Sequence, residues 1–172
     1  CLKENGAGRR TDPADLPKEY LLHAALSNDD TPPLVVQMLL SFYPKSIYLP
    51  DLAAGALPIH LAAMARDYVP RNYEAQSFSF HRMRERSLDI VLEADPSAIY
   101  KRLEGRLPLH LAVASGRMMD SIRVLLKSGA KSIRENGIEK LDFVQLSQRD
   151  PETGLYPFQL SAAYPDKSSD EG

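Results

Sequence analysis

Residues 105–116 read Gly-Arg-Leu-Pro-Leu-His-Leu-Ala-Val-Ala-Ser-Gly, and this stretch predicts a short helix with a marked start and stop. Pro108 has a fixed φ and no N–H, so it suits the first turn of a helix. The glycine at each end tolerates the positive φ of a turn. A second apolar run at helical spacing, from Met118 to Leu126, follows directly. Together they predict two helices joined by a tight turn.

The same pattern recurs along the chain. Residues 55–63 match the stretch position for position, and residues 154–162 match it with glutamine in place of histidine. Residues 21–25 are a weaker copy that lacks the glycine and the proline. Repetition at a period of roughly 20–50 residues is typical of a solenoid, in which similar units stack in a row.

The composition is that of a globular chain of 172 residues, with 44% hydrophobic and 26% charged residues. The net charge of −2 gives no overall attraction for nucleic acid. No apolar run approaches the ~18 residues of a membrane span, so we expect no membrane insertion. The only cysteine is Cys1, so an internal disulfide is excluded, and we expect an intracellular location, cytoplasmic or nuclear. The first residue is not methionine, so we expect a segment of a larger protein.

The repeats define the expected domain, residues 15–164, between a flexible N-terminal tail at 1–14 and a polar C-terminal tail at 165–172. Four repeats are expected, the last incomplete, at about 16–49, 50–100, 101–133 and 149–164. Surplus residues at about 67–79 and 134–148 are expected insertions, and apolar residues between 138 and 146 permit a short helix in the second of them. The other expected helices cover 18–26, 34–43, 58–66, 80–94 and 157–163.

Apolar spacing predicts which side chains of these helices are buried. On the helix expected at 34–43, one face carries Leu34, Val35, Met38, Leu39 and Phe42. Spacing of this kind predicts that the face packs against the rest of the protein.

The pattern Gly-x-x-Pro-Leu-His-x-Ala resembles the Thr-Pro-Leu-His-x-Ala signature of ankyrin repeats. The run Ile122-x-x-Leu125-Leu126-x-x-Gly129-Ala130 resembles the end of that family's second helix. The resemblance covers about residues 16–164, with departures: Leu57, Leu107 and Tyr156 replace the threonine, and Pro44 and Pro96 replace a glycine. It implies an all-α, ankyrin-type helix-turn-helix solenoid of about four repeats with finger-like loops on one edge. It also implies a non-catalytic role, in which the finger tips and the concave face of the first helices bind another protein.

The repeated histidines are predicted to be structural. They sit at the same place in successive repeats and have apolar neighbours, which suits hydrogen bonding to backbone groups of their own or the next repeat. The predicted structural positions are His23, Pro58, His60, Pro108, His110, Pro157 and Gln159. Because no metal-ligand, nucleophile or phosphate-binding motif occurs in the sequence, no catalytic, metal or cofactor site is predicted.

Two segments are candidates for contact with a partner protein. The segment 66–86 interleaves arginines with aromatic residues, a mixture enriched at binding hot spots; its candidates are Arg66, Tyr68, Arg71 and Tyr73. The second segment is the finger edge, where Arg102, Glu104, Arg106, Arg149 and Asp150 are expected to project in a row. The alternative for both is an ordinary solvated loop.

Two other functions stay open at this point. The chain could be a regulatory or targeting domain of a larger enzyme or signalling protein. Alternatively, the segment 66–86 could bind single-stranded nucleic acid by stacking and charge, which the net charge makes the less favoured alternative. The sequence does not name the partner protein, and the domain is expected to be monomeric.

Overall fold

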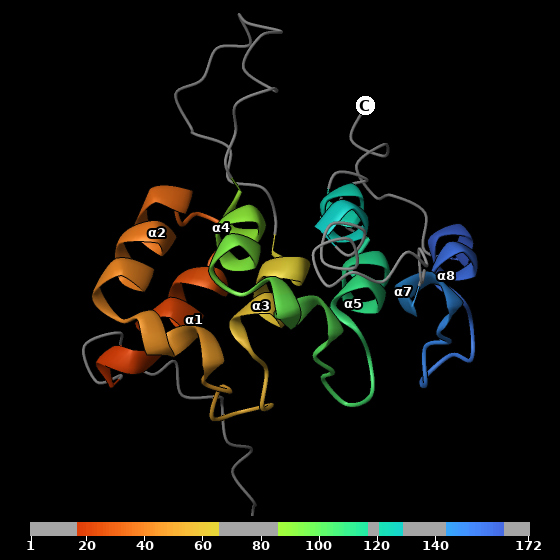
Figure 1. Ribbon diagram of the computed structural model, residues 1–172. Helices are drawn as coiled ribbons and strands as arrows, with labels where there is room; N and C mark the ends of the chain where they lie inside the picture. Colours follow the sequence, from red (N-terminus) through yellow and green to blue (C-terminus); the bar gives the residue numbers. More distant parts are fainter. Residues whose placement is uncertain (1–16, 66–85, 117–120, 129–143, 164–172) are drawn as a thin grey trace, which may run out of the picture.

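The computed structural model describes residues 17–65, 86–116, 121–128 and 144–163 (Figure 1). These residues form helices and loops, and no β-strand occurs among them, as the all-α prediction requires. The α-helices are α1 (Leu21–Leu26), α2 (Pro33–Phe42), α3 (Pro58–Met64), α4 (Ser87–Ala94), α5 (Pro108–Ala114), α7 (Val144–Ser147) and α8 (Pro157–Ala163). The same residues also form the 3₁₀ helices η2 (Lys18–Tyr20), η3 (Pro44–Tyr48) and η5 (Pro96–Tyr100) and a helix over 121–128.

The helices stack side by side in chain order. Helix α3 packs between α1 and α5, and α5 packs in turn against α8. Helix α2 packs on α1 and α4 and lies at one end of the stack (Figure 1). Three loops leave the same edge of the stack, at the bottom of Figure 1. We call them the first finger (49–57), the second finger (101–107) and the third finger (148–156).

Proline sets the start of three of these helices. Pro58, Pro108 and Pro157 are the first residues of α3, α5 and α8. The residue before Pro58 and the residue before Pro108 have extended backbones, with ψ of 158° and 157°, as proline requires of its predecessor. After α5, Gly116 has a φ of +66° and ends the helix.

One continuous core joins the helices. Its fully buried members come from every layer of the stack: Leu22, Val36, Ile59, Val91, Leu109, Leu125 and Leu160. Ala62, Ala63 and Ala112 are also buried, and their small side chains let neighbouring helices approach closely. The core therefore runs along the stack, and neighbouring helices bury apolar side chains against one another in the way expected of repeat proteins.

The 3₁₀ helices η3 and η5 are not part of the sequence-based prediction. They share the pattern Pro-x-x-Ile-Tyr, at 44–48 and 96–100. Each proline follows the end of an α-helix and opens the 3₁₀ turn. The isoleucines, Ile47 and Ile99, turn inward and are 6% and 0% exposed, so each short helix anchors the base of the finger that follows it.

The packing predicted for α2 is wrong for most of the apolar face, although Leu39 is partly buried and packs against the core. The apolar face lies where the periodicity places it, but Leu34, Met38 and Phe42 are 64%, 50% and 71% exposed. Val36, on the other side of the helix, is the fully buried residue. The physical reason is position: α2 lies at the end of the stack, with α1, α4 and η3 packed against it on the Val36 side.

The helix predicted from Phe80 to Ala94 also needs correction. Helix α4 begins at Ser87, because Arg86 has an extended backbone with φ −103° and ψ 155°. The Arg86 N–H donates to Asp89 Oδ2 at 3.3 Å, which caps the first turn. Residues 80–85 lie outside the described part of the chain, as do most residues of the two predicted insertions; of the second insertion, only α7 and the residue after it are described.

Candidate protein-binding surface

The second finger is a two-residue hairpin. Leu103 and Arg106 exchange both backbone hydrogen bonds, at 3.0 and 2.9 Å. Between them, Glu104 and Gly105 have φ of +51° and +84°, the pair of positive values that a type I′ turn requires. A Cβ at Gly105 would lie 3.1 Å from Pro151 Cγ, so this turn also packs closely against the third finger.

An aspartate shapes each of the other two fingers. In the first finger, Asp51 Oδ1 accepts hydrogen bonds from the N–H groups of Ala54 and Ala56, at 2.7 and 3.1 Å. In the third, Asp150 Oδ2 accepts from the N–H and the hydroxyl of Thr153, at 3.2 and 2.8 Å. Burial raises the pKa of Asp51, but the hydrogen bonds from backbone N–H groups outweigh it and hold this pKa below 3.8.

Three buried histidines connect each helix unit to the finger of the next one. His23 Nε2 donates to the carbonyl oxygen of Leu49 at 2.8 Å. His60 Nε2 donates to that of Lys101 at 3.1 Å, and His110 Nε2 to that of Gln148 at 3.0 Å. The three acceptors lie at the bases of the first, second and third fingers. The fingers are therefore held by the neighbouring unit as well as by their own turns.

The other ring nitrogen caps the histidine's own helix. His60 Nδ1 accepts from the Leu57 N–H at 3.0 Å, and His110 Nδ1 from the Leu107 N–H at 3.2 Å. A nitrogen that accepts carries no proton, so both rings are neutral with the proton on Nε2. Burial lowers the pKa of both histidines below the ordinary 6.5, although the carbonyl partners Lys101 and Gln148 oppose this shift.

The first and last copies keep only half of this arrangement. The Tyr20 N–H donates to the Pro17 carbonyl at 2.8 Å instead of to His23, and His23 Nδ1 has no hydrogen-bond partner among the described residues. In the last copy, Gln159 Oε1 accepts from the Tyr156 N–H at 3.0 Å. Gln159 therefore caps its helix as the histidines do, but it is exposed and makes no link to a further finger in the described part of the chain.

Arg106 and Asp150 do not project as predicted from the sequence. Arg106 Nε lies 2.7 Å from Asp150 Oδ1, and the two side chains are 16% and 0% exposed. Arg106 Nη1 also pairs with Glu152 Oε2 at 2.6 Å. A buried carboxylate needs such a partner because desolvation of an unpaired charge is costly. The pair joins the second finger to the third, so both residues are structural parts of this surface rather than its exposed contacts.

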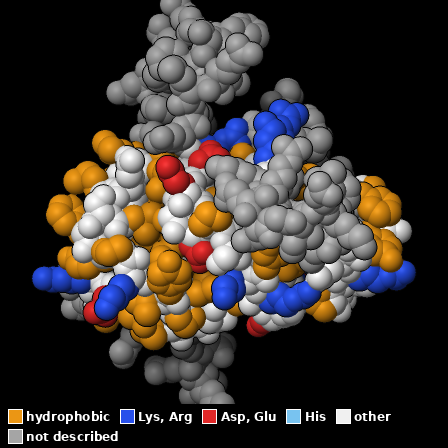
Figure 2. Space-filling model, in the orientation of Figure 1, with side chains coloured by type: hydrophobic (Ala, Val, Ile, Leu, Met, Phe, Trp, Pro, Cys, Tyr) orange, Lys and Arg blue, Asp and Glu red, His pale blue; other side chains and the backbone are white. Residues whose placement is uncertain are grey.

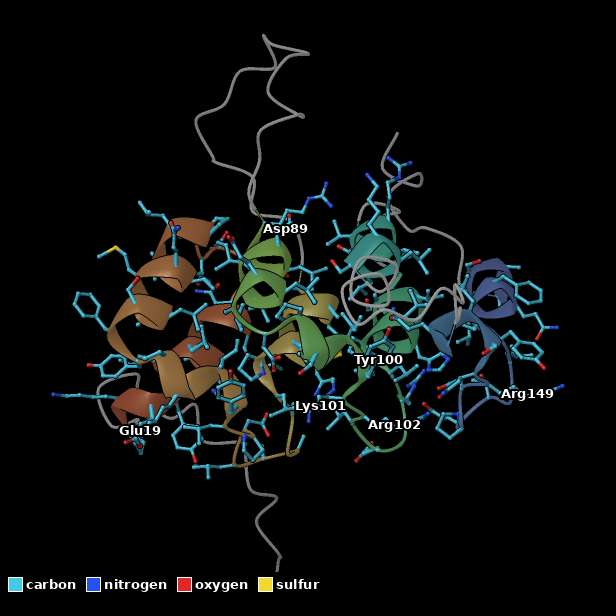
Figure 3. All side chains as sticks on the ribbon, viewed as in Figure 1. Glu19, Asp89, Tyr100, Lys101, Arg102 and Arg149 are labelled. Carbon is cyan, nitrogen blue, oxygen red and sulfur yellow. The ribbon has the colours of Figure 1, made fainter. Side chains whose placement is uncertain are left out.

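The remaining finger candidates are exposed, and the two arginines among them are held in place. Arg102 donates to the Gly105 carbonyl at 2.6 Å and to Gln148 Oε1. Arg149 donates to the Gly154 carbonyl at 3.3 Å, and its Cζ lies 4.7 Å from the centre of the Tyr156 ring. In Figure 3, Lys101 and Arg102 lie together at the second finger, whereas Arg149 points outward at the far end of the stack. Glu104 is exposed at the tip of the second finger.

An aromatic stack beside the third finger was missed by sequence reasoning. Tyr156 and Phe158 are parallel, with an interplanar angle of 8° and ring centres 5.8 Å apart. Phe158 is 64% exposed, although its equivalents Ile59 and Leu109 are 1% and 0% exposed. The usable signal is the phenylalanine at a position that holds an aliphatic residue in the other copies. Arg149 also lies over the Tyr156 ring, so the stack adds an aromatic end to the finger edge.

The other candidate segment cannot be placed. Arg66, Tyr68, Arg71 and Tyr73 lie outside the described residues, and their role stays a prediction. Within residues 17–65, 86–116, 121–128 and 144–163, no group of three or more histidine, cysteine or acidic side chains could hold a metal ion. None of the helices described is long and apolar enough to cross a membrane.

Comparison with known proteins agrees with this geometry at one unit. Residues 104–136 match the family model described as Ankyrin repeat. The match begins at the tip of the second finger and includes α5 and the helix over 121–128. Searches of curated proteins and of solved structures found no match. The chain therefore contains an ankyrin repeat at residues 104–136, which confirms the predicted resemblance to the ankyrin-repeat family.

Proposed function

We propose that the chain is a non-catalytic scaffold or adaptor module, a solenoid of four stacked units that binds another protein through its finger edge and the concave face beside it. Ankyrin repeats are generally interaction modules without catalytic activity, which supports this class of function. The observation that carries the proposal is the finger edge itself. Its loops are held by bonds between units, while Lys101, Arg102, Glu104 and Arg149 stay exposed on them.

Preorganisation supports binding at this edge. Flexible arginine side chains lose rotamer freedom when a partner immobilises them, at roughly 0.5–1.5 kcal/mol for each side chain. Arg102 is already held by Gly105 and Gln148, and Arg149 by Gly154 and the Tyr156 ring. Binding of a partner to these two guanidinium groups therefore costs less side-chain entropy.

Charge indicates the kind of partner segment. Arg106 pairs with both Asp150 and Glu152, so these three side chains together carry one net negative charge. With Lys101, Arg102, Arg149 and Glu104 included, the second and third fingers have four basic and three acidic side chains, an excess of one positive charge. This surface suits an acidic segment of the partner, with the Tyr156–Phe158 stack available for an apolar or aromatic side chain next to it.

The experiment compares protein capture by two double variants of equal charge. Arg102→Glu with Arg149→Glu reverses the proposed contacts, and Lys18→Glu with Lys127→Glu reverses two exposed lysines elsewhere. Proteins captured from a cell extract by the wild-type chain should be lost with the first variant and kept with the second. Arg106 stays unchanged, because its reversal would unpair the buried Asp150. If both variants fold and capture the same proteins as the wild type, the finger edge is not the binding surface.

Two finer statements from the sequence stay proposals. An intracellular location is supported by the single cysteine, Cys1. A regulatory or targeting role within a larger protein is supported only by the general use of ankyrin repeats as interaction modules, and the full-length sequence tests it.

The nucleic-acid alternative depends on the segment 66–86. It predicts binding to single-stranded nucleic acid that weakens steeply with added salt, and the absence of binding at low salt would exclude it.

A further inference from the structure

Helix α2 carries an apolar stripe that is half or more exposed in the described structure. Leu34, Met38 and Phe42 follow one another at intervals of four residues, so they share one side of the helix. They are 64%, 50% and 71% exposed, and Val35 beside them is 39% exposed. Figure 2 shows hydrophobic side chains gathered at the end of the molecule that α2 forms. Exposed apolar surface of this kind often marks an interface.

Helix α4 shows what an equivalent position does when it is covered. Pro44 and Pro96 follow α2 and α4 at the same distance, which makes Ile90 the counterpart of Met38. Ile90 is 8% exposed, with α2 packed against α4. The side of a helix that carries Met38 is therefore a packing side in this fold, and on α2 it is open.

The stripe is complementary to itself. Helix α2, with the sequence Pro-Leu-Val-Val-Gln-Met-Leu-Leu-Ser-Phe, contains no charged residue, so a copy of α2 meets no charge repulsion along the helix. In an antiparallel pair, Met38 contacts Met38 of the copy at the centre, and Leu34 lies against Phe42 on each side. A twofold interface requires such reciprocal contacts. Antiparallel alignment also opposes the two helix dipoles favourably.

The charges at the two ends of α2 favour the same arrangement. Asp29 and Asp30 are exposed just before the helix, and Lys45 is exposed just after it. An antiparallel copy brings the lysine end of one helix beside the aspartate end of the other, twice in each pair. A parallel copy would place like charges together instead.

We propose that the chain self-associates through α2, as an antiparallel pair centred on Met38. This departs from the monomer expected from the sequence and goes beyond binding at the finger edge. The stripe offers a few hundred Å² at most, below the ~800 Å² that each partner buries in a standard interface. The dimer is therefore weak and forms reversibly with concentration.

Sedimentation equilibrium of the 172-residue chain, up to ~100 µM, tests the proposal against three variants. Met38→Glu places two carboxylates at the centre of the pair and should raise the dissociation constant more than ~10-fold. Leu52→Glu changes a residue of the first finger that is 76% exposed and should leave association unchanged. The double finger variant Arg102→Glu with Arg149→Glu should also associate normally, which separates this proposal from the proposed function. A wild-type chain that is monomeric at every concentration overturns the proposal and leaves the stripe to a different protein.

Disulfide cross-linking tests the antiparallel geometry in a Cys1→Ser background. Met38→Cys should form a cross-linked dimer, because the two copies of residue 38 meet at the twofold axis. Leu34→Cys should not, because at 1.5 Å per residue its two copies lie ~12 Å apart along the pair. A mixture of the Leu34→Cys and Phe42→Cys chains should cross-link. Equal cross-linking of Leu34→Cys and Met38→Cys would overturn the antiparallel arrangement.

Discussion

Replacing His110 gives the sharpest test of how the units are held together. Its Nδ1 accepts from the Leu107 N–H at 3.2 Å, its Nε2 donates to the Gln148 carbonyl at 3.0 Å, and the side chain is fully buried. The variant His110→Ala loses both bonds, at a net ~1 kcal/mol each. It also leaves a cavity, and the removal of large buried side chains typically costs about 2–5 kcal/mol. We expect the free energy of unfolding to fall by about 4–7 kcal/mol.

The variant His110→Gln separates the two bonds. The chain already contains glutamine at the equivalent position, where Gln159 Oε1 accepts from the Tyr156 N–H. Glutamine at 110 should therefore keep the helix cap and lose the link to Gln148, which costs about 1–2 kcal/mol. Gln159→Ala is the matched control: it removes an exposed cap only, and should cost about 0.5–1 kcal/mol.

Urea unfolding followed by far-UV circular dichroism measures all three variants. The expected order of destabilisation is His110→Ala, then His110→Gln, then Gln159→Ala, with similar slopes against urea. Two results would refute the reasoning. One is a His110→Ala midpoint equal to that of the wild type. The other is a His110→Gln loss as large as that of His110→Ala, because the cap would then contribute nothing.

Three further predictions concern pH and the turns. The folded chain holds the pKa of His60 and His110 below 6.5, so on acidification the unfolded chain takes up protons first. The contribution of these histidines to stability should therefore be complete above pH 6.5 and should fall as the pH drops through their pKa values in the folded chain. Urea midpoints of the wild type and of a double His→Gln variant, measured against pH, check this. Gly105→Ala, at φ +84° and against the third finger, should cost more than the ~1 kcal/mol of strain expected for Gly55→Ala, at φ +70° in open space, and equal thermal shifts would contradict the close packing. Glu104→Asn suits the positive φ of +51° better and should stabilise by about 0.5–1 kcal/mol in thermal unfolding, whereas a destabilised variant would argue against the type I′ turn.

The parts of the fold that local chemistry determines were predictable from the sequence. Pro58, Pro108 and Pro157 start helices because proline restricts its own φ and its predecessor's ψ. Gly105 and Gly116 lie at positive φ because the adjoining turn and helix end need it. These constraints act within a few residues, so the sequence displays them directly.

The parts that depend on neighbours in space were not predictable in the same way. The periodicity of α2 marks the face that carries Met38, but a sequence pattern does not show whether another helix packs on that face. Aspartate is typical of exposed turns, so the sequence places Asp150 at the surface. In the structure Arg106 of the adjacent finger packs against Asp150, and the Asp150 side chain is buried. The spacing of apolar residues predicts that this helix begins at Phe80. The observed start of α4 depends instead on the contact between Asp89 and the Arg86 N–H.

The histidine links end on backbone atoms, and this affects how the protein can change. The acceptors belong to leucine, lysine and glutamine, at 49, 101 and 148, yet the carbonyl oxygen serves equally in all three. A substitution at any of these positions leaves the acceptor in place. The side chains at 49 and 101 are thus free to vary in charge, size and polarity without loosening the stack, whereas Gln148 also holds Arg102 through its side chain. New binding preferences can arise there one residue at a time, at little risk to the fold.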